Sequence, residues 1–107
     1  DSINDWSDLV ELITKINNSG SAFQDSLETI LNTSTFIEQW AALNMFVNLD
    51  SYLGSGHNYF IYHDTNLDKF EWVAWDLNES FGSFRMNLSV SALKNLSLFF
   101  VPTPGTK

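Results

Sequence analysis

The chain has 107 residues, of which 44% are hydrophobic, and a formal net charge of −8. This length fits a single small domain or part of one, and the 16 aromatic residues are enough to build a core, which excludes wholesale disorder. The acidic excess leaves no basic stripe for nucleic acid, no apolar run is long enough to span a bilayer, and the lack of cysteine excludes disulfides and thiol chemistry.

Two amphipathic helices are predicted at the start of the chain. The first covers residues 8–16, is capped by Asp5 or Ser7, and has apolar residues at the spacing i, i+3, i+4, i+7. Gly20 is expected to take the left-handed backbone conformation in which helices often end. The second helix covers residues 22–31 and is amphipathic in the same way.

A third helix is predicted from Thr35 to about Leu49. Thr35 and Glu38 form a capping box, and apolar residues then occupy nearly every side, which indicates a helix at the centre of the domain. Asp50 ends this helix, so its carboxylate is expected to face the negative end of the helix dipole, at a cost of about 0.3–1 kcal/mol without a nearby cation. From its position alone, Asp50 is better explained as a solvated helix terminus than as a functional residue.

An aromatic-rich β-hairpin is predicted after this helix. Residues 58–63 and 69–75 are strand-like, and the polar residues 64–68 between them are typical of a turn. A last helix is predicted near residues 90–98.

The hairpin is expected to bring three polar or small residues onto one face. With a turn centred on Asn66, Asn58 lies opposite Ala74 and diagonal to Asp76. Diagonal neighbours in a hairpin are about 7–8 Å apart, which lets an amide oxygen and a carboxylate hold one cation. A register slip of one residue would place them on opposite faces.

Two other metal sites are weighed against this one. Residues 64–68 (DTNLD) resemble the start of a calcium loop, but Lys69 replaces the required glycine and Trp75 replaces the final glutamate, so a polar turn is expected. His57 flanks the hairpin and could orient the side-chain amide of Asn58. Together with His63 it gives only two histidines, which is weak evidence for a metal or a base.

Three motifs follow one another in the middle of the chain: residues 40–50 (WAALNMFVNLD), 57–64 (HNYFIYHD) and 70–82 (FEWVAWDLNESFG). In this order they resemble the CotH (spore coat protein H) kinase family. Members of that family have a helix ending in Asp, an H-N-Y-Y-L-Y-like strand and a W-D-x-D-x-x-F-G-like closing motif. The resemblance is strong over residues 36–82 and extends back to about residue 6.

The resemblance implies an α+β fold in which three N-terminal helices pack with the hairpin, as in part of a protein-kinase-like C-lobe. It also implies an atypical protein kinase that uses Mg²⁺ and ATP to phosphorylate Ser or Thr of a protein substrate. By that analogy Asp50 is the catalytic base, while Asp76 and Asn58 hold the ATP-bound metals. Asn78 stands where the family commonly has a second Asp, so it offers an oxygen without a charge. A glycosidase needs two facing carboxylates, and Asp50 and Asp76 could nominally supply them. Glycosidase chemistry is therefore disfavoured rather than excluded.

The chain lacks any counterpart of the lobe that covers the nucleotide. Residues 1–107 are therefore expected to be one fragment of a CotH-like kinase domain, inactive in isolation, with its core at residues 6–82 and a partly ordered tail with a helix at residues 83–107. The resemblance implies an extracellular, cell-surface or spore-coat location in a bacterium, and a coat, cell-surface or cellulosome assembly. The alternative is a non-catalytic binding or structural module with a degenerate kinase-like fold, which Asn78 favours.

Overall fold

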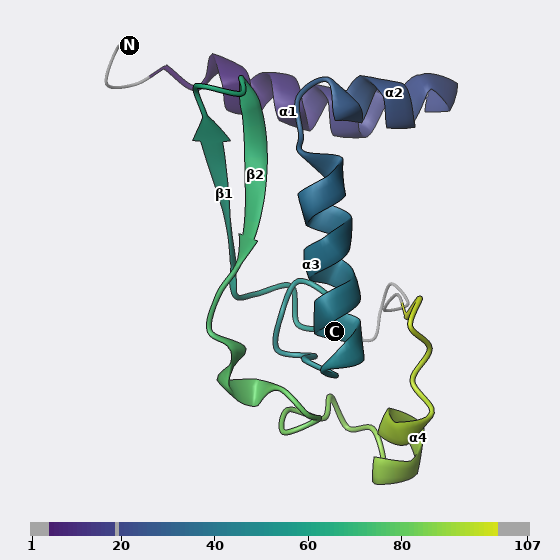
Figure 1. Cartoon of the computed structure of the whole chain (residues 1–107). Helices are drawn as coiled ribbons and strands as arrows, with labels where there is room; N and C mark the ends of the chain where they lie inside the picture. The colour runs from purple at the N-terminus through teal and green to yellow at the C-terminus, as the bar shows by residue number, and fades with distance from the viewer. Residues whose placement is uncertain (1–4, 19, 101–107) are drawn as a thin grey trace.

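The computed structural model describes residues 5–18 and 20–100, so residues 101–107 of the predicted tail lie outside the described residues. The elements in chain order are α1 (Ser7–Asn18), η1 (Gly20–Ala22), α2 (Phe23–Glu28), α3 (Thr33–Met45), β1 (Tyr59–Asp64), β2 (Lys69–Ala74), η2 (Leu77–Glu79) and α4 (Val90–Lys94). In Figure 1, α1 and α2 lie across one end, α3 runs beside the hairpin, and α4 lies at the other end. The predicted α+β class is confirmed. No helix within the described ranges is long and apolar enough to cross a membrane.

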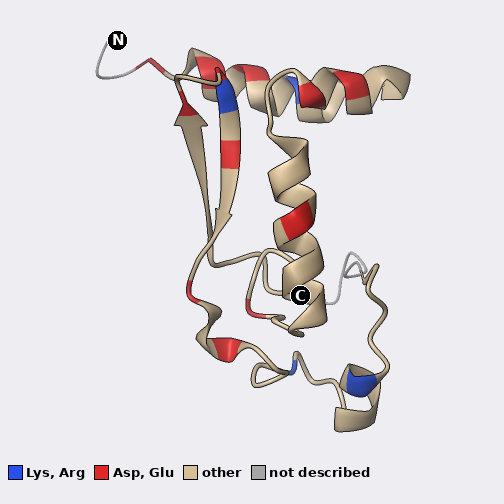
Figure 2. Ribbon diagram, in the orientation of Figure 1, with Lys and Arg blue, Asp and Glu red and all other residues tan. Residues whose placement is uncertain are grey.

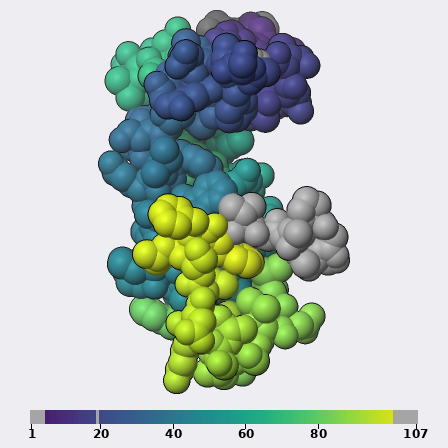
Figure 3. Space-filling view, turned by 90° about the vertical axis from the view of Figure 1, so that its right-hand side faces the viewer, coloured from purple at the N-terminus to yellow at the C-terminus, as the bar shows by residue number. Residues whose placement is uncertain are grey.

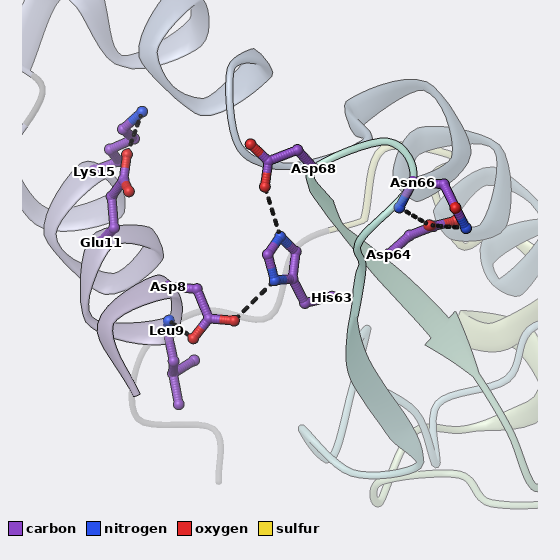
Figure 4. A network of polar contacts seen from close by, with 8 residues as sticks. All are labelled: Asp8, Leu9, Glu11, Lys15, His63, Asp64, Asn66 and Asp68. Atoms are coloured by element: carbon purple, nitrogen blue, oxygen red, sulfur yellow. Dashed lines mark hydrogen bonds and ion pairs between the residues drawn. The ribbon is translucent and has the colours of Figure 1, made fainter. Parts of the chain in front are cut away.

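The first two predicted helices are present and pack against the turn end of the hairpin, although α2 ends at Glu28 and not at the predicted residue 31. Gly20 has φ +51°, which confirms the expected left-handed residue after α1. Leu12 of α1, Ile30 after α2 and Phe70 of β2 form a small buried cluster. The imidazole of His63 lies between two carboxylates, with Nδ1 2.9 Å from Asp8 and Nε2 3.3 Å from Asp68 (Figure 4). This histidine therefore joins α1 to the hairpin.

Helix α3 differs from its prediction at both ends. Its N-cap is Asn32, whose side chain accepts a hydrogen bond from the Thr35 amide at 3.4 Å, so the predicted capping box is wrong. The helix ends at Met45, and Val47 has φ +49°, a conformation that stops a helix. The prediction that Asp50 terminates the helix is therefore wrong. The helix also has an exposed face, because Ile37 is 63% exposed.

The predicted hairpin is present, but the predicted register is wrong by one residue. Tyr59, not Asn58, lies opposite Ala74. The shift arises from a loop of four residues, 65–68, in which the Asp64 carboxylate accepts a hydrogen bond from the Asn66 amide at 2.8 Å (Figure 4). The turn is thus a polar Asx-turn, and its centre lies beyond Asn66.

The free edge of β2 is covered by the segment that leads into α3 and by one side chain of α3. The Phe70 amide donates to Ile30 O at 2.7 Å, and Phe70 O accepts from the Asn32 amide at 2.9 Å. Further along, Gln39 Nε2 donates to Trp72 O at 2.6 Å, and Gln39 Oε1 accepts from the Ala74 amide at 2.9 Å. Gln39 therefore takes the place of a third strand and fixes α3 beside β2.

The main core lies between α3, the hairpin and α4. It consists of Leu43, Leu49, Leu53, Trp72 and Leu93, each at most 8% exposed. Aromatic rings surround it, including Tyr59 stacked on Trp72 at 5.8 Å between centroids. Because Leu49 and Leu53 belong to this core, the loop that carries Asp50 is anchored on both sides. The last helix begins at Val90 as predicted but ends earlier, at Lys94.

Candidate functional site

Asp50 lies in a tightly built loop between α3 and β1. Asn48, Leu49 and Ser51 are fully buried, and the Ser51 hydroxyl donates to Asn48 O at 2.6 Å. The same hydroxyl accepts a hydrogen bond from the Leu53 amide at 3.2 Å. The backbone around Asp50 is thus held by buried neighbours, while the Asp50 side chain is half-buried.

Two side chains orient the Asp50 carboxylate. The Ser55 hydroxyl donates to Oδ1 at 2.9 Å, and the Asn58 amide nitrogen donates to Oδ2 at 3.1 Å. The same Asn58 nitrogen donates to the Asp50 backbone carbonyl at 2.6 Å. The structure therefore brings Asp50 and Asn58 together, and it adds Ser55. The predicted help from His57 is not seen among the described residues, because the Asn58 amide nitrogen bonds Asp50 instead.

Ser55 could not be identified from the sequence, since a serine between Gly54 and Gly56 has the composition of a flexible linker. The structure shows a different role for this segment. A Cβ atom at Gly54 would collide with the carbonyl oxygen of Leu49 and lie 2.7 Å from Met86 Sδ. The glycine therefore allows the loop to fold back on itself and place the Ser55 hydroxyl on Asp50.

Asn58 and Asp76 flank the hairpin strands and both have left-handed backbones, with φ +58° and +50°. Asn and Asp tolerate this conformation better than most residues. The Trp75 amide donates to Asn58 O at 3.1 Å, so Asp76 follows directly after the residue that pairs with Asn58. Because both residues lie outside the regular strands, the expected common sheet face for Asn58, Ala74 and Asp76 is wrong.

Asp76 and Asn78 are exposed and are not joined to Asp50. Asp76 precedes η2 without capping it, and its carboxylate accepts no hydrogen bond from any residue that the structure describes. Asn78 lies within η2, and its side chain likewise has no hydrogen-bond partner in the described part of the chain. Both side chains are thus free to bind a ligand from solvent, but their convergence with Asp50 remains a prediction.

The closing motif is bonded to the segment that precedes Asp50. The Phe81 amide donates to Phe46 O at 2.6 Å, and the Gly82 amide donates to Val47 O at 3.1 Å. The Asn48 side chain also donates to the Ser80 hydroxyl at 3.2 Å. Residues 80–82 therefore lie against the segment that follows α3, and hydrogen bonds join the motif that contains Asp50 to the motif that contains Asp76.

The donor set at this site consists of oxygen atoms. The Asn58 Oδ1 atom accepts no hydrogen bond within residues 5–18 and 20–100, and the carboxylates of Asp50 and Asp76 are unpaired with any cation there. Oxygen ligands of this kind, one or two carboxylates completed by phosphates, are those that Mg²⁺ takes. The described residues contain no group of three or more His, Asp or Glu side chains that could hold a metal without such a ligand.

A family model described as CotH kinase protein matches residues 1–101 of the chain. No curated protein and no solved structure matches it.

Proposed function

The chain belongs to the CotH kinase protein family, and from this premise we propose that it forms the catalytic-site part of an atypical protein kinase. The reaction is transfer of the ATP γ-phosphate to a Ser or Thr hydroxyl of a protein substrate. The observation that carries the proposal is the Asp50 carboxylate, held by Ser55 and Asn58 at the position where the family motif has its aspartate.

In this proposal Asp50 accepts the proton of the substrate hydroxyl. Phosphoryl transfer asks for positioning more than for covalent chemistry, and a base must be aimed at the hydroxyl that it deprotonates. Two donors, Ser55 and Asn58, fix the orientation of the carboxylate, and its remaining lone pairs stay open to the substrate. Ser55 and Asn58 thus act as positioning residues for Asp50.

Asp76, the Asn58 carbonyl oxygen and Asn78 would hold the magnesium of Mg²⁺–ATP. Magnesium supplies neutralisation of the phosphate charge during the transfer. Asp76 is the only charged member of the three, so it contributes most of the electrostatic attraction. Asn78 contributes an oxygen without a charge, and we expect weaker metal binding than with aspartate at this position.

We further propose that this chain alone has no kinase activity, because no segment of it corresponds to a lobe that covers the nucleotide. The location would be extracellular, at a bacterial cell surface or spore coat, within a coat or cellulosome assembly. A second candidate is a non-catalytic binding module. It is favoured by Asn78 and by the outer face of the hairpin, where Phe60 is 54% and Tyr62 61% exposed.

The test uses a protein that contains this chain together with a nucleotide-covering lobe. Mg²⁺-dependent ATP binding is measured by calorimetry, and transfer is measured with γ-labelled ATP and a Ser-rich protein. We expect Asp76→Asn to abolish Mg²⁺-dependent binding, and Asp50→Asn to preserve binding while lowering turnover by about 10²–10⁴-fold. Asp25→Asn, which removes an exposed carboxylate of α2, is the matched control. ATP binding that is absent at millimolar Mg²⁺ would leave the binding module as the function.

A further inference from the structure

The charges of this chain are unevenly distributed along its sequence. All 13 acidic residues lie within residues 1–79, whereas residues 80–107 contain Arg85, Lys94, Lys107 and no acidic residue. In Figure 2 red segments of the ribbon lie on α1, α2, α3, the hairpin and the segment up to η2, whereas after η2 only blue is seen, on α4 and on the loop before it. The last segment of an acidic chain is therefore basic, although η2 and the acidic segment before it lie at the same end of the molecule (Figures 1 and 2).

This basic segment lines an apolar groove of about 320 Å³ between the end of α3 and α4. Phe46 and Phe81 form one wall, with their rings edge to face at 5.7 Å, and Val90 and Leu93 line the groove from the α4 side. Phe81 is 82% exposed although it is a large aromatic residue. A groove with exposed aromatic walls is typical of a surface that binds a partner.

The groove has two cations and no anion. Arg85 and Lys94 are its only charged lining residues. Neither forms an ion pair with a carboxylate of the described residues. A partner for this groove must therefore be both apolar and acidic.

The end of the molecule formed by α1 and α2 is both apolar and acidic. Helix α1 packs Leu12 inward, and together with the residue before it presents an outward apolar stripe of Trp6, Val10 and Ile13, which are 64%, 59% and 50% exposed. Their spacing of i, i+4, i+7 is the one by which an amphipathic helix binds an apolar groove. Residues 5–28 around this stripe contain five acidic residues and a single cation, Lys15, which already pairs with Glu11 at 3.0 Å (Figure 4).

We propose that the outward stripe of α1 in one chain docks into the basic groove of a second copy. Both surfaces are apolar, and their charges have opposite sign. Figure 3 shows α1 and α2 at one end and residues 80–94 at the other, with α3 between them. Because the two surfaces lie at opposite ends, each contact leaves one stripe and one groove free, and association continues head to tail instead of closing as a dimer.

Two double variants of the 107-residue chain test this contact. Val10→Gln with Ile13→Gln removes the stripe, and Arg85→Glu with Lys94→Glu reverses the groove charges; all four side chains are exposed, so the fold is expected to persist, as circular dichroism checks. Mass is followed by analytical ultracentrifugation over a range of protein concentrations. The exchange Arg85→Lys with Lys94→Arg keeps both charges and is the matched control.

The wild type and the control variant should grow beyond dimers as concentration rises, and each double variant should stay monomeric. Raising NaCl to about 0.5 M should weaken wild-type association by about tenfold or more, because exposed charges are screened. A mixture of the two double variants should form one-to-one dimers that do not grow, since one intact stripe meets one intact groove. The proposal is overturned by a monomeric wild type, by a closed dimer, or by association that both double variants retain.

Discussion

Gln39→Leu is the change that best tests how α3 is held beside the hairpin. The Gln39 side chain donates to Trp72 O and accepts from the Ala74 amide, at 2.6 and 2.9 Å. Leucine has a similar size and a similar helix propensity, so the substitution removes the two hydrogen bonds and little else. It leaves one backbone carbonyl and one backbone amide of β2 without a partner.

The expected loss of stability follows from the backbone carbonyl and the backbone amide that Gln39→Leu leaves without a partner. A buried backbone group that loses its partner costs about 1–3 kcal/mol, and the smaller value applies here because Gln39 is half-buried and water can reach the edge. We therefore expect the free energy of unfolding to fall by about 2 kcal/mol, a large share of the 5–15 kcal/mol that is typical of small domains.

Urea denaturation, followed by circular dichroism and by tryptophan fluorescence, measures this loss. Gln24→Leu is the matched control, because Gln24 bonds only the exposed Glu28 at 3.2 Å and its loss should cost less than about 0.5 kcal/mol. Gln39→Glu keeps the acceptor and loses the donor, so its loss of unfolding free energy should lie between the losses of Gln24→Leu and Gln39→Leu. If Gln39→Leu unfolds at the same urea concentration as Gln24→Leu, the edge of β2 does not depend on this side chain.

Two further predictions concern the loop of Asp50 and the start of α1. Gly54→Ala should lower the free energy of unfolding by about 1–3 kcal/mol, because its Cβ meets the Leu49 carbonyl; an unchanged urea midpoint would contradict this packing. Hydrogen bonds from the hydroxyl and the backbone amide of Ser7 hold the pKa of Asp5 below its ordinary value of 3.8. This stabilisation is present above pH 3.8 and is lost as the pH falls through the lowered pKa, so acid should expose the first α1 amides to hydrogen exchange in the wild type. In Asp5→Asn the exchange of the same amides should not respond to acid over that range. If the variant and the wild type respond alike, the Asp5 carboxylate is not the group that holds the start of α1.

The order of elements could be predicted from the sequence because it rests on local periodicity. The stripe of α1, the left-handed Gly20 and the aromatic strands all follow from spacing and composition. The end of α3 could not, because no local pattern places a β-branched residue such as Val47 at φ +49°. The Val47 carbonyl accepts a hydrogen bond from Gly82, a contact between distant segments that overrides the helical pattern.

In the candidate site too, local patterns predict some features and contacts between distant residues decide the others. The motifs predict Asp50, Asn58 and Asp76 as site residues, and of the expected contacts the one between Asp50 and Asn58 is present. The argument that placed Asn58 and Asp76 on one face failed, because it counted register from a turn whose Asx hydrogen bond the sequence did not reveal. Ser55 was missed for a different reason, since only the folded loop brings its hydroxyl to the Asp50 carboxylate.

The backbone conformations do not separate the two functions that the family membership leaves open. Asn58 and Asp76 have positive φ, and such strain costs about 1–3 kcal/mol, less for Asn and Asp than for most residues. A purely structural module would therefore need these two residue types for its backbone, so their presence does not distinguish it from a kinase. Asp50 is not among the residues with positive φ, but each of its two carboxylate oxygens accepts a hydrogen bond, from Ser55 and from Asn58, and asparagine would place an NH2 donor against one of these two donors. A carboxylate at position 50 therefore suits a structural loop as well as a catalytic base, and the effect of Asp50→Asn on turnover, measured beside its effect on stability, is what separates the two functions.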